Sequence, residues 1–124
     1  MGRENRDVGT RGEDRAVKFL ESNGYEIVER NFHTPFGEID AVARRDGFTV
    51  FVEIKTRVSS SLGPPLLNVT RSKERHLVKN ALSYLKIRGL VWSDWRIDVV
   101  SVKLNERYEV ESIELIENAV TEDR

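Results

Sequence analysis

Apolar and polar residues alternate most clearly along one segment near the middle of the chain. Successive side chains of a strand point to opposite faces, so the segment can be divided into two faces. One face would be wholly apolar: Phe48, Val50, Val52 and Ile54. The other face would become charged toward its end: Thr49, Phe51, Glu53, Lys55 and Arg57. The nearly continuous apolar run predicts a central, buried strand over Phe48–Arg57, and charged residues on such a strand require a physical explanation.

The same kind of pattern predicts the remaining elements of a single α/β domain covering residues 1–124. Helical spacing of apolar residues predicts helices at about Arg11–Ser22 and Thr70–Arg88. Four more segments have strand patterns: Tyr25–Phe32, Phe36–Arg45, Trp95–Leu104 and, more weakly, Tyr108–Ile116. The order is therefore αβββαβ with an additional strand. The second helix implies a crossover and a parallel strand pair, in a mixed sheet covered by both helices or by one helix and a loop.

The ends and loops are less regular. Thr10 and Glu13 have the spacing of a capping box, which would begin the first helix there, although the helix could also begin several residues earlier. Serine, glycine and proline over residues 59–65 predict a mobile loop. We expect a frayed N-terminus over about residues 1–8 and a C-terminal tail over about residues 117–124.

Asp46-Gly47 between the second and third strands is typical of a two-residue hairpin turn. That turn would place Asp40 directly across from Glu53, and Glu38 across from Lys55. Opposing side chains lie about 4.5–5.5 Å apart, and like charges at that spacing are destabilising. The two carboxylates would therefore share a proton or bind a cation, for which Mg²⁺ or Mn²⁺ is suited. The alternative is a solvated sheet face with ordinary surface ion pairs.

Composition narrows the function classes. Hydrophobic residues make up 39% and charged residues 33% of the chain, which is typical of a folded domain. The chain has no cysteine, which excludes disulfides, cysteine zinc sites and thiol nucleophiles. No apolar run approaches the ~20 residues that span a bilayer, and the charged N-terminus lacks the apolar core of a signal peptide. We therefore expect a cytoplasmic protein without a membrane partner.

The net charge of −1 conceals an uneven distribution. Residues 71–88 hold six Lys or Arg and one Glu, whereas residues 104–124 hold seven Asp or Glu and two Arg. Four basic residues of the second helix form a stripe: Arg71, Arg75, Lys79 and Lys86. The stripe is either a surface that follows DNA phosphates or a solvated helix face.

Four blocks of the sequence resemble the YraN-like family of small bacterial proteins, within the PD-(D/E)xK nuclease superfamily. The blocks are Arg11–Ala16, Asn31-Phe32 with Gly37–Asp40, Phe51–Arg57, and the helix around Lys73 followed by Arg96–Val100. GEID followed by FVEIKTR is the most specific pair. Ile39 stands where the superfamily signature has proline, which is not a ligand.

The resemblance implies a restriction-endonuclease-like αβββαβ core, similar to Holliday junction resolvases, and Mg²⁺-dependent cleavage of DNA. It implies that Asp40 and Glu53 are metal ligands and that Lys55 is the catalytic lysine. Glu13 matches a carboxylate that related resolvases place on the first helix near the metal, so it joins the expected catalytic and metal-binding residues.

Several other residues complete the expected site. Glu38 would support Lys55, and Lys73 would approach the site from the start of the second helix, where amide groups favour anions. Arg57 and the helix residues Arg71, Arg75 and Lys79 would contact nucleic acid. We therefore expect an endonuclease acting on DNA, and the resemblance to small resolvases implies branched DNA as the substrate class and a homodimer as the assembly. The alternative is a non-catalytic nucleic-acid-binding module that retains the fold.

Overall fold

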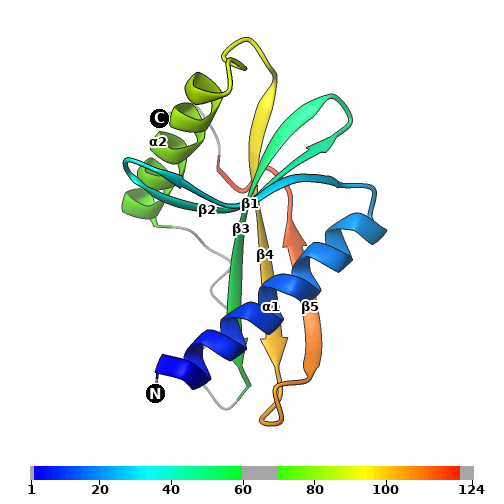
Figure 1. Cartoon of the computed structure of the whole chain (residues 1–124). Helices are drawn as coiled ribbons and strands as arrows, with labels where there is room; N and C mark the ends of the chain where they lie inside the picture. The colour runs from blue at the N-terminus through cyan, green and yellow to red at the C-terminus, as the bar shows by residue number, and fades with distance from the viewer. Residues whose placement is uncertain (1, 60–69, 121–124) are drawn as a thin grey trace.

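The computed structural model describes residues 2–59 and 70–120, and side chains from residue 9 onward within these ranges. The described residues form two helices and five strands (Figure 1). Their bounds are α1 (Gly2–Ser22), β1 (Glu26–Thr34), β2 (Gly37–Arg45), β3 (Phe48–Val58), α2 (Arg71–Ile87), β4 (Trp95–Leu104) and β5 (Val110–Ile116). The strands form one sheet in the order β1-β2-β3-β4-β5.

The predicted α/β class and the mixed sheet are confirmed. β3 and β4 are parallel over ten residue pairs, from Thr49–Trp95 to Val58–Leu104, whereas every other neighbouring pair is antiparallel. The crossover through α2 accounts for the parallel pair. The weakly predicted last strand, β5, pairs with β4 at the edge of the sheet.

The β2–β3 turn has the predicted form. Arg45 and Phe48 are the last paired residues, and Asp46 and Gly47 between them have φ values of 52° and 83°. Positive φ at both central residues is what a tight two-residue hairpin requires, and Asp-Gly accommodates it. The turn therefore fixes the register of the two central strands.

The first helix begins earlier than the capping-box interpretation places it. α1 starts at Gly2, so Thr10 lies inside the helix and is not its N-cap. No proline interrupts the polar residues before Thr10, and each helical residue added to an existing helix gains a hydrogen bond. Residues 60–65 of the expected loop and residues 121–124 of the expected tail lie outside the described residues.

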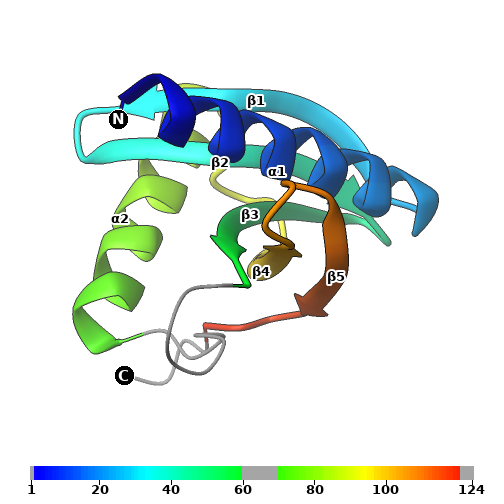
Figure 2. The ribbon, with the colours of Figure 1, turned by 90° about the horizontal axis from the view of Figure 1, so that it is seen from below.

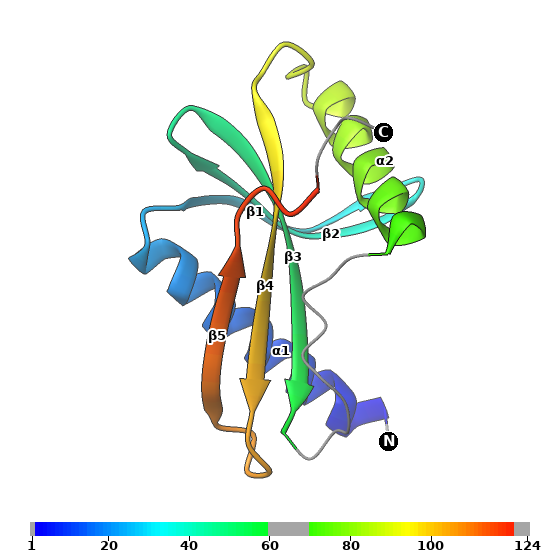
Figure 3. The same ribbon diagram turned by 180° about the vertical axis from the view of Figure 1, so that it is seen from behind.

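The two helices lie on opposite faces of the sheet (Figures 2 and 3). Each helix covers a hydrophobic core of its own. Ala16 and Leu20 of α1 pack against Val50 and Val52 of β3 and their neighbours. On the opposite face, α2 packs against Phe51 and adjacent strands. The predicted division of β3 into two faces is confirmed. No helix among the described residues is long and apolar enough to cross a membrane.

Gly12 allows α1 to approach β3 closely. A Cβ atom at this position would overlap the side chain of Thr56, including the Thr56 Cβ. The next residue, Glu13, is one of the expected site residues. The glycine therefore sets how near Glu13 comes to the sheet.

We predict that Gly12→Ala lowers the free energy of unfolding by about 1–3 kcal/mol, because the added methyl group forces the helix away from Thr56. Gly9→Ala on the same helix is the matched control, since nothing lies within 4 Å of a Cβ at Gly9. That control should gain about 0.5–1 kcal/mol from helix propensity. Urea denaturation of both variants measures the difference, and equal stability would contradict the close contact.

Candidate active site

The two central strands separate partway along their length. The β2–β3 ladder has the predicted register from Arg45–Phe48 to Ala41–Val52 and then ends. Beyond that point β2 stays paired with β1 as far as Gly37, and β3 stays paired with β4 as far as Val58. We call this separation the fork.

The fork corrects two predicted pairs. Asp40–Glu53 and Glu38–Lys55 would follow the last observed pair, but the ladder does not reach them. In place of a regular ladder bond, the Asp40 Oδ2 atom accepts a hydrogen bond from the Ile54 amide at 2.8 Å. The side chain thus satisfies a partly buried backbone donor where the neighbouring strand departs.

A backbone irregularity in β1 accompanies the fork. Asn31 and Asp40 lie between the pairs Arg30–Ala41 and Phe32–Ile39, and Asn31 has a φ of 53°. Ile39 packs in the α2-side core, whereas regular alternation from Ala41 would place it on the α1 side. Sequence reasoning missed this kink, although an asparagine within a strand pattern was a signal for it, because asparagine is depleted in strands and tolerates positive φ.

Glu53 lies on the α2 side of β3 and forms an ion pair. The Lys73 Nζ atom lies 3.0 Å from a Glu53 carboxylate oxygen, and the Glu53 side chain is only 14% exposed. Thr70 caps α2 by accepting a hydrogen bond from the Lys73 amide, which orients the first turn of the helix. The structure therefore brings Lys73 to Glu53.

Glu13 and Glu38 approach the fork from α1 and from the start of β2. Both contribute to the electrostatic environment of Asp40, as Glu53 does. Burial raises the pKa of Glu13, the Arg30 guanidinium lowers it, and Glu38 raises it again. Glu38 lies 3.2 Å from His33 Nε2 on the neighbouring strand, so its contact is with β1 and not with Lys55.

Asp40 carries the largest electrostatic consequence of this arrangement. Burial raises the pKa of Asp40 to about 7, the Ile54 hydrogen bond opposes the shift, and repulsion from Glu53, Glu13 and Glu38 adds to it. A carboxyl group that ionises near neutral pH inside a cluster of carboxylates is typical of a functional site.

The basic residues divide into two groups. Lys55 and Arg57 lie on β3 beyond the fork and are partly exposed, and the Arg57 Nε atom is buried without a hydrogen-bond partner among the described residues. Arg71, Arg75 and Lys79 are exposed on α2. No hydrogen bond or ion pair within the described ranges engages the Lys55 ammonium group.

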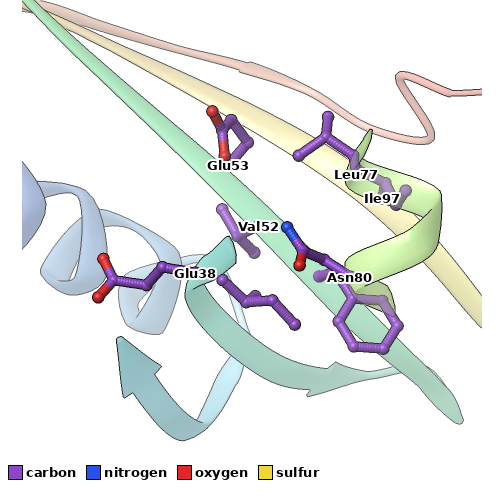
Figure 4. Close-up of a pocket in the computed structure, with 8 residues that line it drawn as sticks. Glu38, Val52, Glu53, Leu77, Asn80 and Ile97 are labelled. Carbon is purple, nitrogen blue, oxygen red and sulfur yellow. The ribbon is translucent and has the colours of Figure 1, made fainter. Parts of the chain in front are cut away.

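A small cavity of about 10 Å³ lies between β2, β3 and α2, with room for about one water molecule (Figure 4). Glu53 and Asn80 project around it, whereas the Glu38 carboxylate extends away from Asn80. In residues 9–59 and 70–120, no group of three or more Asp, Glu or His side chains is arranged to hold a metal. A ligand as large as a nucleotide would have to bind outside this cavity.

Asp98 belongs to a different cluster. Its fully buried carboxylate accepts hydrogen bonds from the Tyr25 hydroxyl at 2.7 Å, from Arg96 Nε at 3.1 Å and from the Asn118 amide at 2.8 Å. By alternation along β4, Asp98 points to the α1 face, opposite Glu53. Asp98 therefore stabilises the fold and is not part of the fork.

Comparison with known proteins places this sequence in a family. A sequence model described as "Uncharacterised protein family UPF0102" matches residues 12–102. The chain belongs to the UPF0102 family. This confirms the resemblance to the YraN-like proteins, and the matched residues include every expected site residue from Glu13 to Lys79.

Three relatives illustrate the extent of the similarity to UPF0102 proteins. The chain is 42% identical over 114 residues to a UPF0102 protein of Caldicellulosiruptor saccharolyticus, and the alignment covers 92% of this chain and 97% of the relative. It is 46% identical to a UPF0102 protein of Pelobacter propionicus, with 89% of this chain and 81% of the relative covered. It is 43% identical to one from Geobacter metallireducens, covering 96% of each. The UPF0102 name states no activity, so the function rests on the site.

We predict that Asp40→Asn stabilises the protein increasingly as the pH rises. The amide oxygen can still accept the Ile54 hydrogen bond, but it carries no charge. Because the folded-state pKa of Asp40 is raised from 3.8 to about 7, ionised Asp40 destabilises the native fold. The gain should be near zero at pH 4, grow between pH 4 and pH 7, and level off above pH 7 at ~2–4 kcal/mol.

Urea denaturation of the two proteins in EDTA, at pH values from 4 to 8.5, measures this gain. A difference that does not increase with pH would contradict the raised pKa of Asp40.

Proposed function

We propose that this UPF0102 protein is a divalent-metal-dependent endonuclease that hydrolyses phosphodiester bonds in DNA. The observation that carries the proposal is the environment of Asp40 at the fork. Its carboxyl group is half-buried near Glu53, Glu13 and Glu38, and its pKa is raised to about 7. A site that concentrates negative charge in this way favours a cation, and Lys73 already places one cation at Glu53.

The acidic residues at the fork fit Mg²⁺ or Mn²⁺ by their chemistry. Their carboxylates are the hard oxygen donors that these ions prefer. Mg²⁺ is usually held by one or two protein carboxylates, with water and phosphate oxygens completing its coordination. Asp40 and Glu53 would hold the ion, with Glu13 next to them on α1. Such an ion, when bound, neutralises phosphate charge and lowers the pKa of water.

The protein's own cations would act on the phosphate. Lys55 lies on β3 two residues after Glu53, by alternation on the same face, and no ion pair with a described residue holds it. Its ammonium group would stabilise negative charge that develops on the phosphoryl oxygens as the bond to the leaving oxygen breaks. Arg57 follows on the same face, and its Nε atom, which has no hydrogen-bond partner among the described residues, is a further donor.

The surface beside the fork suits a DNA backbone. Lys73 contacts Glu53 at the fork from the first turn of α2, and Arg71, Arg75 and Lys79 form an exposed stripe on another side of the same helix. Cations spaced along a helix interact with phosphates without reading sequence. We therefore assign these residues to backbone binding, with branched DNA as the substrate class that the family resemblance implies.

One observation favours a second candidate, a non-catalytic DNA-binding module. Glu53 is already neutralised by Lys73, and the described carboxylates do not form a ready group of three around one point. If the protein only binds DNA, Asp40→Ala should leave DNA affinity unchanged or increase it, since the substitution removes negative charge.

Cleavage of end-labelled DNA tests the proposal. We expect the native protein with Mn²⁺ to cut at least one of linear duplex, single strand, flap and four-way junction. Lys55→Ala and Asp40→Asn should lower the rate by at least ~100-fold, as expected for loss of a group that stabilises transition-state charge. Lys18→Ala, which removes an exposed charge from α1, is the matched control and should cut at the native rate.

Two results would count against the nuclease. The first is binding of all four substrates without cutting, which favours the non-catalytic module. The second is cutting that persists in Lys55→Ala and Asp40→Asn, because the activity would then not depend on the fork.

The Lys73–Glu53 ion pair makes a separate prediction about the metal. Lys73→Met should raise the affinity of the DNA-free protein for Mn²⁺ about fivefold, because ~1 kcal/mol of attraction no longer competes for Glu53. Lys73→Arg keeps the charge and should bind like the native protein, and Lys18→Met controls for the loss of a charge elsewhere. Titration calorimetry gives the three affinities, and an unchanged value for Lys73→Met would exclude the competition.

A further inference from the structure

Phe36 is an exposed aromatic residue close to the fork. It lies in the turn between β1 and β2, four residues before Asp40, and its side chain is 49% exposed. At ~3.3 Å per residue, the strand between them spans about 13 Å. Phe36 therefore sits within a few nucleotides of the fork and is assigned to neither hydrophobic core.

The turn that carries Phe36 is fixed to α2. The Thr34 hydroxyl hydrogen-bonds to the side-chain oxygen of buried Asn80, and it also accepts a hydrogen bond from the Phe36 amide at 3.0 Å. Gly37 has a φ of 148°, and a Cβ at that position would lie 2.8 Å from His76 Nε2. These contacts hold the backbone of the turn on both sides of the exposed ring.

The rest of the β1–β2 hairpin is anchored to the same helix, which lies beside it in all three ribbon views (Figures 1, 2 and 3). The rings of Phe32 and Tyr84 pack edge to face at 4.9 Å. The Glu29 carboxylate accepts hydrogen bonds from the Tyr84 hydroxyl and from Arg88, at 2.7–2.8 Å. Phe36 is thus presented on a rigid support, which reduces the entropy lost when a ligand packs on it.

Positive charge lies over the ring on its α2 side. The Lys79 ammonium lies 5.8 Å from the centre of the Phe36 ring. Arg75 lies one helical turn before Lys79, and its exposed side chain can reach a phosphate. An aromatic ring flanked by cations is the arrangement that holds single-stranded nucleic acid, where bases stack on the ring and phosphates contact the charges.

We infer that Phe36 is a stacking platform for an unpaired base of the DNA, with Lys79 and Arg75 holding the adjoining phosphates. The inference rests on the proposed function and names its substrate class: DNA with unpaired bases within about four nucleotides of the cut, at ~3.4 Å per nucleotide. Bases in an intact duplex are already stacked on their neighbours and offer no free face to the ring. Fully paired linear DNA is therefore a poor ligand for this surface.

Fluorescence anisotropy in EDTA, where no cutting intervenes, tests the platform with three labelled probes: a blunt duplex, a single strand and a 5′ flap. Phe36→Ala should weaken binding of the single strand and the flap about tenfold, the loss expected for one stacked base. Binding of the blunt duplex should change less than twofold. Phe36→Tyr retains a ring and should bind like the native protein.

Val28→Ala is the matched control, because Val28, which lies on β1 of the same hairpin, is also an exposed apolar residue, with 42% exposure. Its affinities should equal the native ones for all three probes. A thermal melt of each variant verifies folding, which truncation of a half-exposed side chain should leave intact.

Other results would overturn the inference. An equal loss on all probes, or no loss on any, excludes stacking on an unpaired base. A shift from dimer to monomer in sedimentation, without loss of single-strand preference, would assign Phe36 to contact with a second copy of the chain. Cutting by Phe36→Ala at the native rate on all substrates would contradict the stacking role of Phe36 but not the nuclease activity. If the native protein neither binds nor cuts DNA, both the stacking role and the proposed function are wrong.

Discussion

The hydrogen bond from the Ile54 amide to the Asp40 carboxylate is the interaction on which the site depends. It allows β2 to separate from β3 without leaving the partly buried Ile54 amide unpaired, so the sheet can open between two well-packed cores. The same bond keeps the Asp40 carboxylate inside the fork, near Glu53 and Glu13. The contact that stabilises the opening therefore also creates a local excess of negative charge. The packing of the surrounding cores must offset the free energy that this repulsion costs.

Much of this fold follows from local patterns. The two faces of β3 follow from a repeat of two residues, and Asp46-Gly47 determines the register because few residue pairs adopt positive φ twice. The bounds of β4 and α2 agree with the apolar pattern to within a residue, aided by the Thr70 cap. The same hairpin pattern, read along the chain, singles out Asp40 and Glu53 as candidate site residues, and the UPF0102 match covers both.

What the sequence could not reveal depends on how elements pack in three dimensions. The β2–β3 ladder ends beside the irregular backbone at Asn31 and Asp40, and no local pattern along the chain predicts where the ladder ends. The pairing of Glu38 with His33 rather than Lys55 follows from the same departure. The Lys73–Glu53 ion pair requires the first turn of α2 to lie within side-chain reach of β3, which no spacing along the chain encodes.

The Asp46-Gly47 turn also bears on the order in which the protein can fold. Asp40 and Glu53 belong to one hairpin, whose short loop closes at a small cost in chain entropy. The parallel pairing of β3 with β4 joins residues much farther apart in sequence and is the costlier step. Lys73 lies on the crossover that must be placed for this second step. A chain between the two stages therefore carries its acidic pair without the counter-charge, and electrostatic attraction, in addition to burial, favours the docking of α2.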